Sequence, residues 1–257
     1  MTQMGSTNKI ENNSSNMSIG DHLEELRIRV IFALLGVAAC TIVGLVFGGR
    51  IISFMELPYT SVMAENSQLQ TLSPTEGLTS YFKIALITGL ILSSPWVFYH
   101  LWMFIAAGLY AHERRYINIA APFSAVLFIC GAVFFLLVVA PLTLKFLLKV
   151  NDHLGLSSHW TFPYYISFVT NLMLIFGLAF QTPIVIFFLN RTGIVSLAAL
   201  CKSRKYVLLI ITILAAMATP PDVISQIALA IPLYLLFELG ILLSYLATRK
   251  KVTVRGK

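Results

Sequence analysis

Long apolar segments separated by short polar connections make up most of the chain. A helix needs about 20 predominantly apolar residues to cross the hydrocarbon core of a bilayer. Segments near this length recur along the sequence, and none is confined to the short apolar region of a cleavable signal. The pattern therefore predicts an all-α integral membrane protein, a bundle of six transmembrane helices. The six segments lie at residues 28–48, 76–103, 117–140, 164–190, 206–218 and 223–247.

The fifth segment is the shortest. Its sequence, YVLLIITILAAMA, would reach about 20 Å as a helix, against about 30 Å for the hydrocarbon core. It is either re-entrant or one arm of a hairpin, 206–247, that sits low in the bilayer. We favour the hairpin, which makes the fifth and sixth spans short. Pro95, Pro183 and Pro232 lie inside other spans and predict kinks there.

Composition supports a membrane protein, and the placement of charge sets its orientation. The chain has 257 residues, of which 58% are hydrophobic and only 11% charged, too few to coat a soluble domain of this size. Most of the 18 Lys and Arg residues fall in segments that would be cytoplasmic if the N-terminus is inside. The positive-inside rule therefore predicts that both termini are cytoplasmic. The net charge of +7 then reflects topology and does not indicate a nucleic-acid partner.

Three regions follow from this pattern. Residues 1–20 are rich in Asn, Ser, Thr and Met and should form a disordered polar tail. Residues 21–248 form the six-span membrane domain, and residues 249–257 form a basic cytoplasmic tail. The outer connections, about 27 residues from Gly49 and about 23 from Pro141, are longer than the inner ones, which run from about 11 to 15. We therefore expect a structured outer cap.

The motif SPTEG begins the second span and predicts a capping box. Ser73 would be the N-cap, Pro74 would occupy the first helical position, and Glu76 would accept free backbone N–H groups. This structural interpretation of Glu76 is favoured over a functional one.

No constellation for catalysis or metal binding occurs. The chain has no GxxxxGK[ST] loop, no HExxH motif and no GxSxG motif, and its three cysteines show no disulfide or metal spacing. The sequence therefore predicts neither an enzyme nor a cofactor. An ion-coupled secondary transporter of a small solute is the alternative, because Lys83 and Glu238 are ionisable residues within apolar runs, where such groups usually face a pathway or a partner. No convincing internal repeat supports that alternative.

Gln181, in GLAFQTPIVIF, is a polar residue near the middle of the fourth span. Its amide could hydrogen-bond a neighbouring helix or the backbone freed by the following proline, a contribution of about 1 kcal/mol. It could equally contact a polar residue of another subunit. The sequence leaves both interpretations open.

Two short acidic motifs are expected on the cytoplasmic side. In GDHLEELRIRV, Glu25 lies one helical turn before Arg29, and this spacing favours a local ion pair. In WMFIAAGLYAHERRY, Glu113 stands alone among basic neighbours. Isolated carboxylates of this kind suit a guanidinium ligand, because they accept arginine through two parallel N–H bonds that lysine cannot reproduce.

These motifs, in their order along the chain, resemble the TatC family, the multispanning core of the twin-arginine protein translocase. The resemblance covers about residues 17 to 248 and rests on five motifs. They are HLEELR at 22–27, SPTEG at 73–77, LW.FIA.GLY.HERR at 101–115, FGLAFQTP at 176–183 and TPPDVISQ..LAIPLYLLFELG at 219–240.

The resemblance implies a receptor that binds the twin-arginine signal peptides of folded proteins in the bacterial cytoplasmic (inner) membrane. It implies that TatA-like and TatB-like single-span partners, self-association in the receptor complex and the proton motive force complete the translocase. Glu25 and Glu113 would form the signal-binding patch, shaped by Leu26, Arg27 and Phe104.

The resemblance also assigns expected roles outside that patch. Gln181 would contact a partner helix, Asp222 and Gln226 are matched polar positions, and Pro58 would shape the outer cap. Two residues depart from the family pattern: Ala107 stands where many relatives have proline, and Gln181 stands where relatives often carry glutamate. A mechanism that needs protonation at residue 181 is therefore not supported.

Overall fold

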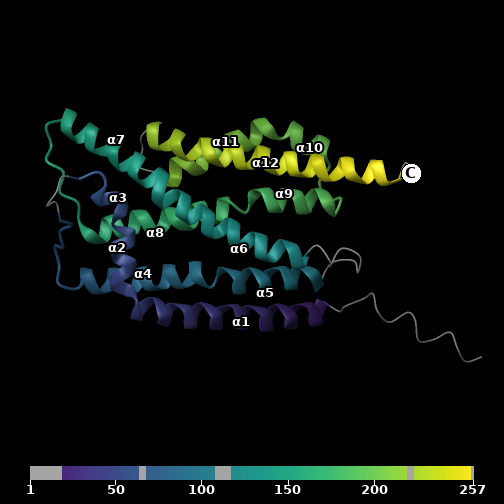
Figure 1. The fold of residues 1–257 in the computed structure, drawn as a ribbon, viewed down its shortest axis with the longest axis horizontal. Coiled ribbons are helices and arrows are strands. Elements are labelled where there is room, and N and C mark those ends of the chain that lie inside the picture. The colour runs from purple at the N-terminus through teal and green to yellow at the C-terminus, as the bar shows by residue number, and fades with distance from the viewer. Residues whose placement is uncertain (1–18, 64–67, 108–116, 219–222, 256–257) are drawn as a thin grey trace, which may run out of the picture.

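The computed structural model describes residues 19–63, 68–107, 117–218 and 223–255, and helices account for most of these residues (Figure 1). Outside helices, the described ranges contain one isolated β-bridge, between Gln70 and Thr161. The helices are α1 (Ile19–Val46), α2 (Gly48–Met55), α3 (Leu57–Thr60), α4 (Glu76–Leu92), α5 (Ser94–Ala107), α6 (Ile117–Phe134), a π-helical turn (Phe135–Val139), α7 (Ala140–His153), α8 (Phe162–Ala179), α9 (Thr182–Arg191), α10 (Leu197–Lys202), α11 (Arg204–Ala218) and α12 (Val223–Arg255).

Among the described residues, four helices are long and apolar enough to cross a membrane, and a bent pair makes a fifth unit when it is taken as one span. Four are continuous or nearly so, at Leu23–Val46, Ala120–His153, Phe162–Arg191 and Leu229–Leu246, and the fifth is the bent pair of α4 and α5. They correspond to the first four segments and the sixth. The fifth segment is a helix, α11, of 15 residues. It is shorter than the roughly 20 residues that a helix needs to cross the hydrocarbon core. Its short length is confirmed, whereas the count of six spans stays a prediction.

Two of the three expected proline kinks coincide with helix breaks. The helix breaks at Ser93, just before Pro95, and α4 and α5 are bent by 55° relative to each other. Pro183 lies in the first turn of α9, just after the break that follows α8. Pro232, in contrast, lies inside α12, which continues as one helix. The helices are therefore interrupted at two positions, because proline removes a backbone donor that the helix would otherwise use.

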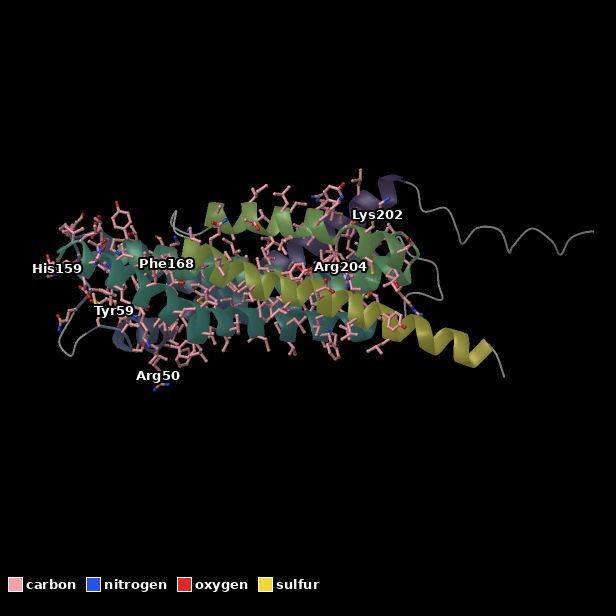
Figure 2. The ribbon with its side chains drawn as sticks, turned by 90° about the horizontal axis from the view of Figure 1, so that it is seen from above. Arg50, Tyr59, His159, Phe168, Lys202 and Arg204 are labelled. Carbon is pink, nitrogen blue, oxygen red and sulfur yellow. The ribbon has the colours of Figure 1, made fainter. Side chains whose placement is uncertain are left out.

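The helices run roughly parallel to one axis, and the two ends of the bundle differ. At the termini end, α1 begins and α12 ends, whereas α2, α3 and the end of α7 lie at the opposite end, which we call the cap end (Figure 1). Figure 2 shows Lys202 and Arg204 toward the termini end, and Arg50, Tyr59 and His159 at the cap end.

The cap end is ordered by contacts between segments far apart in the chain. The hydroxyl of Tyr165 donates to the carbonyl of Met55 at 2.7 Å, and the backbone of Gln70 pairs with that of Trp160 and Phe162. Pro58 is fully buried in α3, as expected of a residue that shapes the cap. The structured cap is thus present.

One part of the cap differs from the expected connection. The segment from Pro141 is not a loop, because helix continues through the π-helical turn and α7 to His153. The π-helical turn shifts the hydrogen-bonding register just before Pro141, which has no N–H to donate. The helix therefore passes a proline that the sequence suggested would end it. At the C-terminus, α12 reaches Arg255, so helix also covers most of the expected C-terminal tail.

The start of α4 also corrects a prediction. The helix begins at Glu76 with Thr75 as the N-cap and without a side-chain capping bond, so Ser73 and Pro74 precede it. Ser73 Oγ hydrogen-bonds to Thr75 Oγ1 at 3.2 Å and makes no capping bond to a backbone N–H of α4. Glu76 still accepts an upstream backbone N–H, that of Leu72 at 2.8 Å.

The central core lies among α4, α6, α8 and α12, and α1 packs on its edge. Phe135, Ile166 and Phe176 are fully buried in this core. By contrast, only 6% of the residues in the membrane-spanning part of α1 are buried. The helix approaches its neighbours at glycines, because a Cβ on Gly89 of α4 would lie 2.7 Å from Thr41 Cα of α1. Glycine there permits the close contact that holds α1 in place.

Replacing Gly89 with alanine is therefore expected to lower the free energy of unfolding by about 1–3 kcal/mol, because the added methyl would push α1 and α4 apart. Thermal unfolding of the purified protein in detergent would measure the change. Gly77→Ala is the matched control on the same helix, since a Cβ there meets nothing within 4 Å. Equal stability of the two variants would contradict close packing at Gly89.

Candidate functional site

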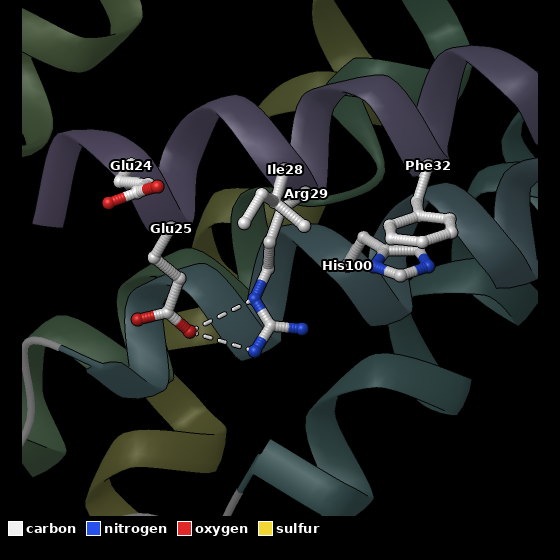
Figure 3. A pocket seen from close by; sticks show the side chains of 6 residues that line it. All are labelled: Glu24, Glu25, Ile28, Arg29, Phe32 and His100. Atoms are coloured by element: carbon white, nitrogen blue, oxygen red, sulfur yellow. Dashed lines mark hydrogen bonds and ion pairs between the residues drawn. The ribbon is translucent and has the colours of Figure 1, made fainter. Parts of the chain in front are cut away.

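A cavity of about 450 Å³ lies between α1 and α5 toward the termini end. Figure 3 shows its lining: Glu24, Glu25, Ile28, Arg29 and Phe32 from α1, and His100 from α5. Residues three, four and seven positions apart on a helix share one face. For this reason the sequence of α1 brings Glu25, its neighbours one turn away and Phe32 to the same wall of the cavity.

Glu25 forms the local ion pair that its spacing predicts. Arg29 donates from Nε at 3.1 Å and from Nη2 at 2.8 Å, and both bonds end on the same oxygen, Glu25 Oε1 (Figure 3). The side chains of Arg29 and Glu25 are 22% and 24% exposed. The carboxylate is thus accessible from the cavity while already holding a guanidinium.

His100 is the residue of this site that sequence reasoning missed. Its side chain is only 8% exposed, and its ring stacks on Phe32 with centroids 5.7 Å apart and planes 8° apart. Neither Nδ1 nor Nε2 has a hydrogen-bond partner within the described ranges. A histidine in an apolar run, four residues before Phe104, was the signal available, but its meeting with Phe32 depends on how α1 and α5 pack.

Trp96 fastens α5 to α1 beside this pair. Its Nε1 donates to the carbonyl of Phe32 at 2.8 Å, and its ring packs edge-on to His100 at 4.7 Å. The cavity wall is therefore held by contacts that join the two helices, and the imidazole has little freedom to turn away.

The structure places the remaining residues of the expected patch only in part. Leu26 and Arg27 follow Glu25 on α1, and Phe104 lies half-buried on α5 one turn beyond His100. Glu113 and Asp222 lie outside the described residues. The pairing of Glu25 with Glu113 therefore stays a prediction. Among the described side chains, no group of three or more His, Cys, Asp or Glu residues could hold a metal ion.

Gln181 is at the centre of a buried hydrogen-bonded cluster. It lies at the break between α8 and α9, is 9% exposed, and donates from Nε2 to the carbonyl of Ser124 at 2.8 Å. The hydroxyl of Ser124 in turn accepts from Trp102 Nε1 at 2.8 Å. The amide thus bonds a neighbouring helix, which is one of the two interpretations of Gln181. Contact with a partner helix stays a prediction.

Three further polar residues of the apolar segments have partners on neighbouring helices. Lys83 donates to Ser167 Oγ at 3.0 Å, and Gln226 donates to the carbonyl of Thr212 at 3.0 Å. Glu238 pairs with Arg204 at 2.8 Å and accepts from the hydroxyl of Tyr234 at 3.0 Å. These contacts make Lys83, Gln226 and Glu238 links between helices.

In the described part of the chain, four or five membrane-length helical units with an ordered cap at one end and a cavity holding Glu24 and Glu25 toward the other define a polytopic membrane protein. Residues 21–232 match the family model of the Sec-independent protein translocase protein (TatC). The chain belongs to the TatC family.

Known relatives match most of the chain. It is 38% identical over 244 residues to the Sec-independent protein translocase protein TatC of Aquifex aeolicus, covering 93% of this chain and 99% of the relative. It is 35% identical over 226 residues to the TatC of Haemophilus influenzae, covering 87% of each. A solved structure described as the crystal structure of the twin arginine translocase receptor TatC superposes with a TM-score of 0.78 at 38% identity, covering 88% of this chain and 99% of the other.

The buried cluster at Gln181 makes a stability prediction. Gln181→Leu should lower the free energy of unfolding by about 1 kcal/mol or more, because the carbonyl of Ser124 loses its donor in a buried place. Unfolding in detergent measures the change, with Gln68→Leu, an exposed residue at the cap end, as the control. A Gln181→Leu protein as stable as the control would show that the bond contributes nothing.

Proposed function

We propose that the chain is the receptor and core subunit of a twin-arginine translocase, which exports folded proteins across the membrane with the proton motive force as its energy source. The observation that carries this proposal is the match over most of the chain to a structure described as the twin arginine translocase receptor. The family match to a Sec-independent protein translocase supports the same conclusion. This role is not enzymatic.

The cavity at Glu25 supports recognition of arginine. A partly exposed carboxylate accepts a guanidinium through charge-assisted bonds, which are roughly twice as strong as neutral ones. The Glu25 oxygen already binds one guanidinium, that of Arg29, which supports a guanidinium as the kind of ligand it takes. We assign Glu25 and Glu113 to the arginines of the signal peptide, with Leu26, Arg27 and Phe104 as surrounding contacts.

The two ends of the bundle support a placement in the membrane. The start of α1 and the end of α12 share one end with the Glu25 cavity and with Lys202 and Arg204 (Figures 1 and 2). Basic residues gather on the cytoplasmic side of membrane proteins. We therefore place both termini and the cavity on the cytoplasmic side of a bacterial inner membrane, with TatA-like and TatB-like single-span proteins as partners.

The transporter alternative has no observation in its favour. It rested on Lys83 and Glu238 as ionisable groups facing a pathway. Both side chains bond to residues of this same chain, Lys83 to Ser167 and Glu238 to Arg204 and Tyr234. Such partners are what a structural link between helices requires.

A peptide pair tests the receptor directly. A photo-crosslinkable synthetic signal peptide with two consecutive arginines should label the chain near Glu25, and the same peptide with two lysines should lose most of that labelling. The reason is that an ammonium cannot reproduce the two parallel N–H bonds of a guanidinium. Equal labelling by both peptides would sink the proposal, and mapping the crosslinked residues by mass spectrometry locates the site.

Charge removal at the site gives a second test. Glu25→Gln should weaken binding of the arginine peptide about 10- to 100-fold, the range expected for losing a hydrogen bond to a charged group. The same substitution at Glu113 should act alike. Asp152→Asn, which removes an exposed carboxylate at the cap end, is the matched control and should bind normally. The role of Glu25 would be structural if its variant were instead lost from the membrane.

A further inference from the structure

The carboxylate proposed to bind a ligand arginine is occupied by an arginine of the chain itself. Arg29 holds Glu25 Oε1 through two bonds. A ligand guanidinium must therefore displace Arg29, or share the carboxylate with it at the cost of placing two positive charges together. This inference rests on the proposed function, because it concerns how the same site accepts its ligand.

The geometry of the pair favours displacement by a guanidinium from outside. Arg29 reaches Glu25 from the next turn of the same helix, and both of its bonds converge on one oxygen. A ligand that approaches freely can align its guanidinium with both carboxylate oxygens in parallel, which is the stronger arrangement. Binding of the ligand guanidinium to Glu25 is then the favourable part of the exchange. The unfavourable part is the charge of Arg29, which is left without a partner near the membrane.

The cavity contains a second partner for Arg29. His100 lines the same space, and in Figure 3 the guanidinium of Arg29 lies on the His100 side of the Glu25 carboxylate. A neutral imidazole offers one acceptor nitrogen, and neither ring nitrogen of His100 is used within the described part of the chain. Phe32, on whose ring the imidazole stacks, lines the same cavity and holds the imidazole there.

We propose that Arg29 is an internal competitor for Glu25 and that His100 receives it when a ligand guanidinium binds. In the empty site Arg29 bonds Glu25; in the occupied site the ligand bonds Glu25 and Arg29 donates to the imidazole of His100. His100 is thus a positioning residue that lowers the cost of opening the site. As a competitor, Arg29 lowers the affinity of every ligand for Glu25 by the same factor and keeps weak ligands from occupying it.

A double-mutant cycle tests the exchange in the full-length protein, with a fluorescent synthetic peptide carrying two arginines as the probe. His100→Phe keeps an aromatic ring against Phe32 but removes the acceptor, and it should weaken peptide binding about tenfold. His100→Gln keeps an acceptor and should bind within about twofold of the unmodified protein. In an Arg29→Gln background, His100→Phe should have no effect, because no arginine remains to be received.

The outcomes separate the exchange from packing and from failure of the proposed function. Loss of affinity on His100→Phe in both backgrounds, or equal loss with His100→Gln, would show that His100 only packs and would overturn the exchange. No loss on His100→Phe in a protein that still prefers the arginine peptide would overturn the exchange and leave the receptor function standing. No preference for the arginine peptide over the lysine peptide would overturn both.

The same set of variants includes a control for effects on folding. Lys202→Gln removes one exposed positive charge at the same end of the bundle and serves as the control for Arg29→Gln. Where Arg29→Gln lowers thermal stability more than this control does, Arg29→Met gives the same cycle, because methionine removes the positive charge and, unlike glutamine, every donor of the side chain. Persistence of the His100→Phe effect in that background counts against the exchange.

Discussion

A polar side chain at membrane depth is stabilised by a partner inside the protein, because the hydrocarbon core supplies no water. This constraint explains how the helices of the chain are joined. Gln181 with Ser124 links the α8–α9 break to α6, Lys83 with Ser167 links α4 to α8, and Glu238 with Arg204 links α12 to α11. Each contact fixes one helix against another at a defined height, which apolar packing alone does less well.

The same constraint acts on the backbone where helices break. The α4–α5 break at Ser93 and the α8–α9 break at Gln181 each precede a proline, so each leaves backbone groups without their usual helical partners. Both residues are buried, and Ser93 Oγ donates to the carbonyl of Leu90 at 3.2 Å. The first break also has a consequence for the site. Gly89 of α4 packs against the second half of α1, and after the bend Trp96 of α5 bonds its first half at Phe32.

Much of this fold was predictable from the sequence, since membrane-length apolar runs leave few structures open to a chain. The positions of the helices, the short α11, the bend before Pro95 and the helix break after α8 follow from local pattern. So does the Glu25–Arg29 pair, which depends only on helical spacing. The family motifs predict a binding role for Glu25, which stays a prediction, and only the helical spacing indicated that Arg29 pairs with that carboxylate.

The features that could not be predicted depend on packing or on small differences in backbone register. Helix continues past Pro141 because the π-helical turn before it alters the hydrogen-bonding pattern, and no residue type signals such a turn. Ser73 is not an N-cap because its hydroxyl pairs with Thr75 instead. His100 could be placed in the site only once α1 and α5 were known to pack side by side. In each case the missing information was a contact, not a composition.

The position of α1 explains why an exchange of partners fits this site. Only 6% of the membrane-spanning part of α1 is buried, against 33–44% for the three other single spans, so its face toward the cavity can be reached by a ligand without opening the core. A site on such a helix is accessible to a ligand. It has fewer packed neighbours, however, to fix the conformation of an unpaired carboxylate. Pairing Glu25 with Arg29 on the same helix supplies that order locally. The stacked rings of Phe32 and His100 supply a fixed surface one turn further along, contributed by both α1 and α5. The cavity therefore combines a charged side chain that can change partner, that of Arg29, with a ring held in place, that of His100. In the proposed exchange, Arg29 leaves Glu25 and returns to it while the helices keep their positions.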